Sequence, residues 1–532
     1  MTTSQAGAAK LSAWAPLAIP AFRVLWFAQL GSNIGTWMQT VGAQWYLVDA
    51  AAGAAVIALV QTASFAPAML FSLPAGVLSD VLDRRKLLIW GSIVSAIVAA
   101  ALTVVAAANV LTPWTLLGFT FVLGITSTLT SPAWQAIQPE LVPREMIGAS
   151  SALGGVTVNG ARAVGPALAG LILSAFGVSV VFALNALSFV AAAIALIWWK
   201  RPAQTGLDDR ERFGAALRAG VRYIASAQLV RRILLRSALF ALPASALWAL
   251  LPLTSRRLDL DSAGYGLLLG ALGVGAIVGI FLLPIARTRY SDNVVIAASA
   301  LLFAVGTLAA AFLPFLAALV LLVLAGLAWI GTLTVLNAAL QLTLPQWVRS
   351  RGAATYILVF MGTMAIGSFL WGLVAELFGT TEALTAAAIL LVLVAASTRF
   401  LPLLPGTGTI DRTISLTWAT PNLVFEPDPT DGPVLVINRY IVRPNSVAPF
   451  QNAMKGVAAS RRRTGGYRWQ LFRSGEDEDL MLESFMVPSW AEFRRQQTQR
   501  LTGRDREILA EARDYCEGDP VERHYFSTKT SS

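Results

Sequence analysis

The chain has 532 residues, of which 56% are hydrophobic and only 13% are charged. A soluble domain of this length does not need so many apolar residues, so the composition predicts an integral membrane protein. The formal net charge of +10 does not indicate a nucleic-acid partner, because the basic residues stand in loops between apolar runs. The retention of Lys and Arg on the cytoplasmic side already explains such loops.

Residues that carry redox, metal or nucleotide chemistry are scarce. The one cysteine, Cys516, excludes an intramolecular disulfide and a metal cluster of several cysteines. No GxxxxGK[ST] segment occurs in the chain, which argues against a nucleotide-driven pump. We therefore expect no cofactor, no metal site and no enzymatic activity.

Twelve apolar runs are long enough to span a bilayer, since a spanning helix takes about 20 residues. Six precede the basic central stretch, at 22–49, 54–79, 85–108, 113–138, 146–176 and 178–199. Six follow it, at 229–255, 263–286, 292–312, 314–344, 352–378 and 380–402. The first run exceeds the apolar core of a signal peptide, about 7 to 15 residues, so it is predicted to be a retained helix.

Charge in the connecting loops predicts the orientation. Basic residues alternate from loop to loop, and the strongly basic loops fall on one side, which should be cytoplasmic. The predicted segments are an N-terminal segment 1–21, a bundle 22–199, a cytoplasmic loop 200–228 and a second bundle 229–402. We expect a multi-pass protein of the cytoplasmic membrane, with the lipid bilayer as its partner and both termini in the cytoplasm.

An internal repeat relates the two bundles. Gly165, Gly170, Leu171, Phe176 and Gly177 recur at one constant offset as Gly367, Gly372, Leu373, Phe378 and Gly379. Two six-helix halves of this kind are typical of transporters, whose substrate site lies near the midplane between them. The alternative is a chance alignment of glycine-rich helices.

The loop GVLSDVLDRRK, from Gly76 to Lys86, joins the second and third predicted helices. Its basic residues Arg84, Arg85 and Lys86 should remain cytoplasmic. Asp80 can pair with Arg84 or cap a helix N-terminus, and would in this way hold an inner gate shut. The second bundle repeats the loop without its carboxylate.

Polar side chains form a stripe along the first predicted helix. At 100 degrees per residue, its members lie within about 80 degrees of one another, with Trp37 at the edge. They are Gln29, Asn33, Thr36, Thr40 and Gln44. The tenth helix carries Thr334, Asn337 and Gln341 at spacings of three and four. Lipid cannot satisfy amides, so the stripes should line a substrate cavity or bond to other helices.

Arg162 lies about nine residues inside the apolar core of the fifth predicted helix, roughly 14 Å along the helix and close to the middle of the bilayer. A charge at this depth is costly unless it is paired or wetted. Its partner is either an anionic substrate or a structural group such as a carbonyl, and Asn159 is its neighbour on the same face in both cases.

Prolines mark two further positions. Gly165 and Pro166 predict either a swivel in the fifth helix or close packing of helices. Pro243 and Pro252 bracket Trp248 in the seventh helix, which suggests a broken helix beside the cavity.

Carboxylates that could couple transport to protons are few. The candidates are Asp49 and Glu376 near the outer helix ends and Glu140 near an inner end. Such a group must gain and lose a proton at an accessible site.

The loop at Gly76, Asp80 and Arg84 resembles that of the major facilitator superfamily, although Val81 and Asp83 replace the usual Arg and Gly. Residues 131–170 resemble the branch called transmembrane secretion effectors, which includes the enterobactin exporter and macrolide-efflux-like proteins. The sharpest matches are Pro139, Glu140, Pro143, Asn159, Arg162, Gly165 and Pro166. The resemblance covers about residues 15 to 402. It implies export of a siderophore, macrolide or drug-like molecule by alternating access and proton antiport.

The last part of the chain is polar. Residues 403–433 predict a linker, and 434–529 follow the β-α-β-β-α-β order of a ferredoxin-like α+β domain. This domain resembles the dimeric α/β-barrel family that includes antibiotic-biosynthesis monooxygenases, which implies possible dimerisation. His524 is expected at a strand end or interface. The basic run Arg461 to Arg463 is expected to be a solvated helix end or to contact anionic lipid.

Two rival functions remain. An importer of the same fold differs only in direction, which the resemblance around Asn159 to Pro166 disfavours. A membrane-anchored enzyme or sensor would instead act through the C-terminal domain.

Overall fold

The computed structural model describes residues 12, 14–200, 222–405, 407, 411, 421 and 423–527. Most of the expected central loop 200–228 and part of the linker 403–433 therefore lie outside the described residues. The chain divides into two compact units. The first comprises Met1–Gly206, Arg236–Leu336 and Ala354–Pro402, and the second comprises Leu207–Leu235, Asn337–Ala353 and Leu403–Ser532.

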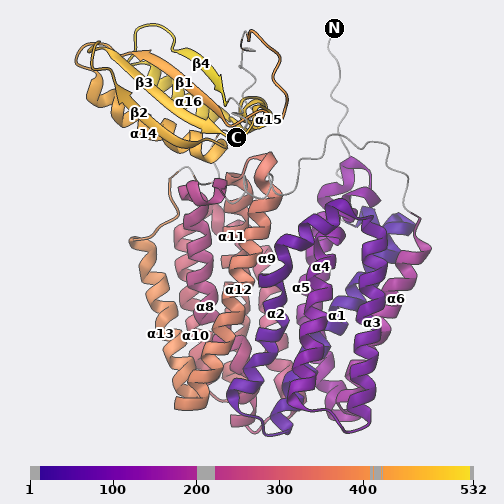
Figure 1. Cartoon of the computed structure of the whole chain (residues 1–532). Coiled ribbons are helices and arrows are strands. Elements are labelled where there is room, and N and C mark those ends of the chain that lie inside the picture. The colour runs from indigo at the N-terminus through magenta and orange to yellow at the C-terminus, as the bar shows by residue number, and fades with distance from the viewer. Residues whose placement is uncertain are drawn as a thin grey trace, which may run out of the picture. The chain divides into compact units, whose positions relative to one another are not determined.

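The first half of the membrane region consists of six long helices. They are α1 (Pro20–Asp49), α2 (Ala54–Val81), α3 (Arg84–Ala107), α4 (Pro113–Ile137), α5 (Ile147–Phe176) and α6 (Val178–Trp198). Helix α1 packs against α5 and α6, and α4 packs against α2 and α3 (Figure 1). Local signals fix where helices begin: Asp83 accepts a hydrogen bond from the backbone N–H of Lys86, and Thr112 forms a capping box before Pro113.

The second half repeats this plan. Its helices are α8 (Gln228–Arg257), α9 (Ser262–Arg289), α10 (Asp292–Phe312), α11 (Phe315–Thr343), α12 (Arg349–Phe378) and α13 (Thr380–Ala396). Asp261 and Ser291 cap α9 and α10 by accepting backbone N–H bonds. Pro243 and Pro252 lie inside a continuous α8, so the expected break in this helix is not present.

Among the described helices, eleven are long and apolar enough to cross a membrane by length and composition. Helix α1 is outside this set, although we expected twelve spans and α1 has 30 residues. The polar stripe explains the difference, because its amides and hydroxyls lower the hydropathy of every window through the helix.

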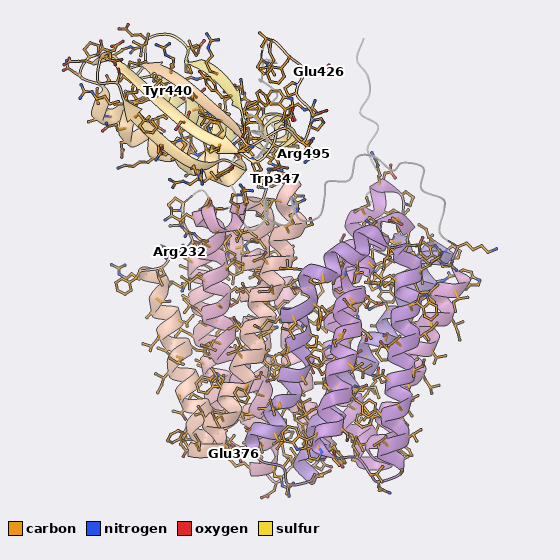
Figure 2. All side chains as sticks on the ribbon, viewed as in Figure 1. Arg232, Trp347, Glu376, Glu426, Tyr440 and Arg495 are labelled. Carbon is orange, nitrogen blue, oxygen red and sulfur yellow. The ribbon has the colours of Figure 1, made fainter. Side chains whose placement is uncertain are left out.

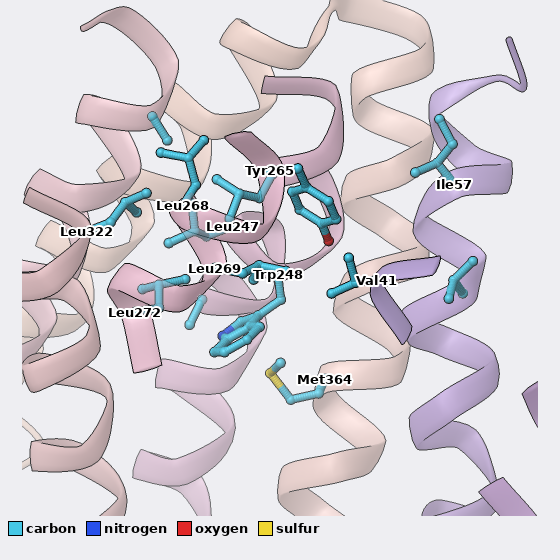
Figure 3. Packing of buried hydrophobic residues seen from close by; sticks show 14 of the residues in the cluster. Val41, Ile57, Leu247, Trp248, Tyr265, Leu268, Leu269, Leu272, Leu322 and Met364 are labelled. Carbon is cyan, nitrogen blue, oxygen red and sulfur yellow. The ribbon is translucent and has the colours of Figure 1, made fainter. Parts of the chain in front are cut away.

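The two halves contact each other within the first unit, chiefly through α5 and α9. Small residues allow this approach: a Cβ added at Gly266 would lie 2.5 Å from the carbonyl oxygen of Pro166. Figure 3 shows Val41, Trp248 and Tyr265 in the packed region that both halves share, and all three are almost fully buried. In membranes, such close packing supplies the attraction that the hydrophobic effect supplies in water.

The C-terminal domain is an antiparallel sheet with helices on one face. Its elements are β1 (Val434–Ile441), α14 (Val447–Thr464), β2 (Tyr467–Arg473), β3 (Leu480–Val487), α15 (Trp490–Arg495), α16 (Gly503–Arg513) and β4 (Val521–Phe526). The strand order is β2-β3-β1-β4, and each neighbouring pair is antiparallel. Both the order of elements and the sheet agree with the predicted ferredoxin-like α+β domain.

Candidate functional site

A cluster of aromatic rings and one arginine lies where the two halves meet. We call Trp37 on α1, Arg162 on α5, Trp248 on α8 and Trp329 on α11 the central cluster. The guanidinium carbon of Arg162 lies 5.6 Å from the ring centroid of Trp37. The Trp37 and Trp248 centroids are 5.8 Å apart, and those of Trp248 and Trp329 are 5.2 Å apart. Four helices from both halves therefore contribute to one continuous group.

Phenylalanines extend the cluster within the second half. Phe240, Phe303 and Phe360 each have their ring centroid within 5.9 Å of that of Trp329. Trp248 and Trp329 are 4% and 5% exposed, so their rings are almost completely enclosed.

Three N–H groups of this cluster lack acceptors in the described structure. Arg162 Nε, Trp248 Nε1 and Trp329 Nε1 are buried and have no hydrogen-bond partner. Arg162 makes one bond, from Nη1 to Asn159 Oδ1 at 3.3 Å, and Asn159 donates in turn to the carbonyl of Gly155. An unpaired buried donor typically costs about 1 to 3 kcal/mol, so three such donors in one cluster are unusual in a folded protein.

Gln44 connects the two halves next to this cluster. Its Nε2 donates to the carbonyl oxygen of Trp248 at 3.3 Å, and its Oε1 accepts from the hydroxyl of Tyr265 at 2.7 Å. Gln61 donates to the same oxygen at 3.4 Å. Gln44 is fully buried, and its amide is therefore used in holding the halves together.

The rest of the α1 stripe has local partners. Gln29 donates to Asn33 Oδ1 at 3.1 Å, and Thr40 donates to the carbonyl of Thr36. Thr36 is exposed, whereas Asn33 and Thr40 are partly buried. The hydrogen-bonding groups of these side chains therefore have partners within α1. That these side chains line a substrate cavity stays a prediction.

The corresponding residues of α11 belong to a different compact unit. Asn337 and Gln341 lie near the end of α11, in the second unit, whereas Thr334 lies in the first. That the two stripes line opposite walls of one cavity stays a prediction.

Gly165 and Pro166 serve helix packing in this structure. Helix α5 continues through both residues without interruption. A Cβ at Gly165 would meet the Cβ of Trp37 at 2.6 Å and the carbonyl of Ile34 at 3.1 Å. Glycine is therefore needed to bring α1, with Trp37, against α5 and Arg162.

The basic loop ties together helix ends within the first half. Arg84 pairs with Glu140 at 2.8 Å, and Arg85 donates to the carbonyl oxygens of Leu196 and Ile197 at the end of α6. A cation at a helix C-terminus is favourable because the carbonyl groups there are unpaired. Gly76 has open space around it, and Asp80 has a side chain outside the described part of the structure. The backbone N–H of Lys86 donates to Asp83 Oδ1 at 2.9 Å.

The second half repeats one part of this arrangement. Arg287, which corresponds to Arg84, forms a two-fold hydrogen-bonded pair with Asp292 at 2.9 and 3.3 Å. Each half therefore anchors its own basic loop with a carboxylate.

At the other end of the bundle, charged side chains of the second half bind helix ends of the first. Glu376 on α12 accepts a hydrogen bond from the backbone N–H of Ala55, in the first turn of α2, at 2.9 Å. Arg256 on α8 donates to the carbonyl oxygen of Val48, in the last turn of α1, at 2.6 Å. Figure 2 labels Glu376 at this end, which we call the latched end. Both contacts match the polarity of the helix ends, negative at an N-terminus and positive at a C-terminus.

A cleft of about 640 Å³ opens at the latched end. Asp49, Arg256, Asp259 and Asp261 contribute charge to its lining, and Asp49 is exposed. None of the four central-cluster residues lines this cleft, so it is a charged vestibule and not the central site.

The C-terminal domain contains its own buried charge network around Glu483, which is 0% exposed. Glu483 accepts hydrogen bonds from Asn438, Tyr440, Arg461 and Trp469, at 2.8, 3.0, 3.0 and 2.9 Å. Burial alone would raise the pKa of Glu483, but the charge and hydrogen bonds of Arg461 outweigh it and lower that pKa. Tyr440, labelled in Figure 2, keeps its proton because burial raises its pKa well above the usual value.

The expectation that Arg461 to Arg463 form a solvated helix end is wrong for two of the three. Arg461 is 5% exposed and pairs with Glu483, and Arg463 pairs with Asp505. The partners come from β3 and α16, which the local sequence could not reveal. His524 lies on β4, and the centroid of its ring is 4.7 Å from that of Phe493. Its Nε2 lies beside the carboxylate of Glu522.

Sequence reasoning missed several residues of the central region. Trp329, Tyr265, Gln61 and Phe360 were not singled out, because an aromatic ring or a lone amide in an apolar helix gives no sign of which neighbour it meets. Arg236 was also missed: it is 1% exposed and donates to Ser397 at 2.7 Å.

Comparison with known proteins decides the family. The family described as "Transmembrane secretion effector" matches residues 11–531. The chain belongs to this family of membrane transporters. The match runs on through the C-terminal domain, beyond the expected limit near residue 402, while no comparison confirms the likeness of that domain to dimeric α/β barrels.

Two relatives illustrate the range of the family. The staphyloferrin A transporter of Staphylococcus aureus (strain NCTC 8325 / PS 47) is 23% identical over 65% of this chain and 87% of its own length. Macrolide efflux protein A of Streptococcus pyogenes is 28% identical over 32% of this chain, and the match spans less than half of that protein, 43%.

Solved structures share the fold at low sequence identity. A point mutant of the nucleoside transporter NupG has a TM-score of 0.61 at 13% identity, over 72% of this chain and 99% of that chain. A bacterial homolog of the human lysosomal transporter Spinster has a TM-score of 0.58 at 15% identity, over 72% and 96%. The protein is thus a multi-pass membrane transporter of the major facilitator type.

Proposed function

We propose that this transporter exports a small organic molecule across the cytoplasmic membrane by alternating access, in exchange for protons. The observation that carries the proposal is the central cluster. It brings together three unpaired N–H donors from both halves, and transporters of two repeated halves bind substrate near the midplane between the halves. Export is favoured by the description of the family as secretion effectors and by its relative macrolide efflux protein A.

The charge of the loops indicates which end of the bundle faces the cytoplasm. Arg84, Arg85 and Lys86 stand at the end opposite the latched end, and Lys and Arg are retained in the cytoplasm. We therefore place both termini in the cytoplasm and the latched end outside. Glu376 and Arg256 then close an outer gate, and substrate would reach the central cluster from the cytoplasm.

Proton antiport rests on the family resemblance. Of the three coupling candidates, Glu140 pairs with Arg84, Glu376 holds α2, and Asp49 lines the vestibule. Asp49 is the one whose carboxylate faces an open cleft, so it is the first to test as the proton carrier.

Two alternatives have specific support. An importer would use the same cluster, and the staphyloferrin A transporter is named without a direction. A sensor or enzyme would act through the C-terminal domain, where the Glu483 network lies, and that domain would also mediate any dimerisation. The bundle's central donors favour transport, because a mere anchor has no need of them.

Everted membrane vesicles test the proposal. Vesicles containing the full chain, acid inside, are offered a macrolide, a hydroxycarboxylate siderophore and aromatic acids. We expect accumulation of at least one compound that collapses when an ionophore removes the pH gradient. Vesicles without the protein are the control. Accumulation only in right-side-out vesicles would establish import instead, and no accumulation in either would overturn transport of these classes.

A further inference from the structure

The central cluster also carries information about the cargo. Resting on the export function above, we propose that the cargo is an organic anion with an aromatic or conjugated frame. Its acceptor oxygens bind Arg162 and the indole N–H groups of Trp248 and Trp329, while its frame lies against the tryptophan rings.

Hydrogen-bonding capacity is the first argument. Arg162 Nε, Trp248 Nε1 and Trp329 Nε1 are all donors, and all are buried without a partner. The nearby side-chain acceptors are already used, since Asn159 Oδ1 takes a bond from Arg162 and Gln44 Oε1 takes one from Tyr265. A cargo that satisfies this site must present acceptors, which carboxylates, phenolates and carbonyls do.

Charge is the second argument. Helices α1, α5, α8, α10, α11 and α12 supply the cluster and its phenylalanine extension. Their carboxylates are Asp49 and Glu376, in the last turns of α1 and α12, and Asp292, in the first turn of α10. No carboxylate in the described residues of these helices lies level with Arg162, so the site is electropositive and the cargo supplies the counter-charge.

The rings give the third argument and exclude the obvious rival. Tryptophan faces bind cations well, so a cluster of rings alone would suit an aminosugar macrolide. Here Arg162 already lies over Trp37, at 5.6 Å, and would repel a second cation. The rings of Trp248 and Trp329 are tilted by 60° to one another with their centroids 5.2 Å apart, and a flat, conjugated frame that enters between them would stack on these faces.

The donors come from both halves, so the cargo can couple its own binding to movement of one half relative to the other. Arg162 belongs to α5, whereas Trp248 and Trp329 belong to α8 and α11. An anion that binds all three groups contacts both halves at once. Its binding is therefore sensitive to their relative movement, as alternating access requires.

A binding experiment with four probes tests this inference on the purified full chain. The probes are 3-hydroxy-2-naphthoate, its neutral amide, citrate and erythromycin, measured by equilibrium dialysis. We expect the naphthoate to bind at least about tenfold more tightly than its amide and than citrate, since a charged hydrogen-bond partner and a stacked ring each contribute that much. Erythromycin should not compete with it.

Variants assign the binding to the proposed groups. Arg162→Ala should weaken naphthoate binding by at least about tenfold, and Trp248→Phe and Trp329→Phe by about three- to tenfold each, because phenylalanine keeps the ring and removes the N–H. Trp114→Phe is the matched control, since Trp114 is 69% exposed on α4. Unchanged binding in both tryptophan variants would overturn the inference, even if Arg162→Ala proves too unstable to purify.

The outcomes separate the cargo from the function. If erythromycin accumulates in everted vesicles while the naphthoate neither binds nor competes, the anion inference fails and export stands. If the naphthoate binds as expected but no probe moves in vesicles of either orientation, the site is assigned and the transport function fails. Equal binding of citrate and naphthoate would overturn the aromatic part of the inference.

Discussion

Glu483 shows how one residue organises the C-terminal domain. It joins the side chains of two strands and one helix through four donors, and its charge is balanced by Arg461. A buried ion pair adds little stability compared with apolar packing, but removal of one partner leaves an uncompensated buried charge. Substitution of either Glu483 or Arg461 should therefore be strongly destabilising.

Glu483→Gln should destabilise the C-terminal domain by about 3 to 5 kcal/mol, because Arg461 stays buried without its counter-charge. Limited proteolysis of the full chain in detergent, read by the rate of loss of the C-terminal fragment, measures the change. Glu507→Gln is the matched control, since its pair with Arg504 is exposed on both sides. Equal protease resistance in both variants would contradict the prediction that Glu483 stabilises the C-terminal domain.

The same carboxylate gives a pH dependence. Its pKa is lowered in the folded domain, so its contribution to stability is present above the unfolded pKa, about 4.3. That contribution is lost as the pH falls through the lower, folded value. Protease resistance of the C-terminal domain should therefore decrease in acid, and the decrease should be smaller in Glu483→Gln.

Helix α5 is the element on which the two halves meet. Its small residues face α9, and Gly165 brings it close to α1 beside Trp37. Close packing of this kind needs small side chains along a whole face, because one Cβ in the wrong place separates the backbones. The α5 and α9 pair is thus close-packed through backbone and small side chains.

Gly266→Val should force α5 and α9 apart, since even a Cβ there would lie 2.5 Å from the carbonyl of Pro166. We expect a loss of about 1 to 3 kcal/mol of stability from overpacking, and transport reduced at least in proportion. A thermal-unfolding midpoint and vesicle uptake measure the two effects. Gly160→Val on α5 is the control, because nothing lies within 4 Å of its added Cβ. Similar losses of stability and transport in both variants would argue against a specific need for glycine at the contact of α5 with α9.

At this scale the sequence predicts much of the structure. The bounds of most helices follow from apolar length and caps such as Asp83 and Thr112, and the strands follow from alternation in segments such as 480–487. Arg162 and the α1 stripe are visible because polar groups are rare in apolar helices. The place of Trp329 in the cluster and the role of Glu376 cannot be predicted in this way. A tryptophan in an apolar helix or a glutamate at a helix end does not indicate which residue of another helix it contacts.

For the whole molecule, contacts between α2 and α12 join the two halves of the membrane region. Thr62 on α2 donates to the carbonyl of Ala365 on α12 at 3.0 Å, and it lies about two helical turns from Ala55, which Glu376 binds. A transporter that alternates must break these contacts in every cycle. They are therefore good positions at which to arrest it.

A cysteine pair at Thr62→Cys and Ala365→Cys, in a Cys516→Ser background, should cross-link on mild oxidation and stop vesicle uptake. Reductant should restore uptake, since the bond is reversible. Ser95→Cys with Thr126→Cys is the matched control, because their hydroxyls are 2.7 Å apart within the first half. Full uptake by a quantitatively cross-linked Thr62 and Ala365 pair would rule out separation of α2 from α12 during transport.

The latched end is asymmetric in what each half gives. In its two hydrogen bonds the second half contributes side chains, Glu376 and Arg256, and the first half contributes backbone groups of Ala55 and Val48. Every amino acid except proline offers those same backbone groups, so random substitution in the adjoining turns of α1 and α2 leaves the grip intact. Selection can therefore adjust these two hydrogen bonds through two codons of the second half more readily than through the sequence of the turns that they bind.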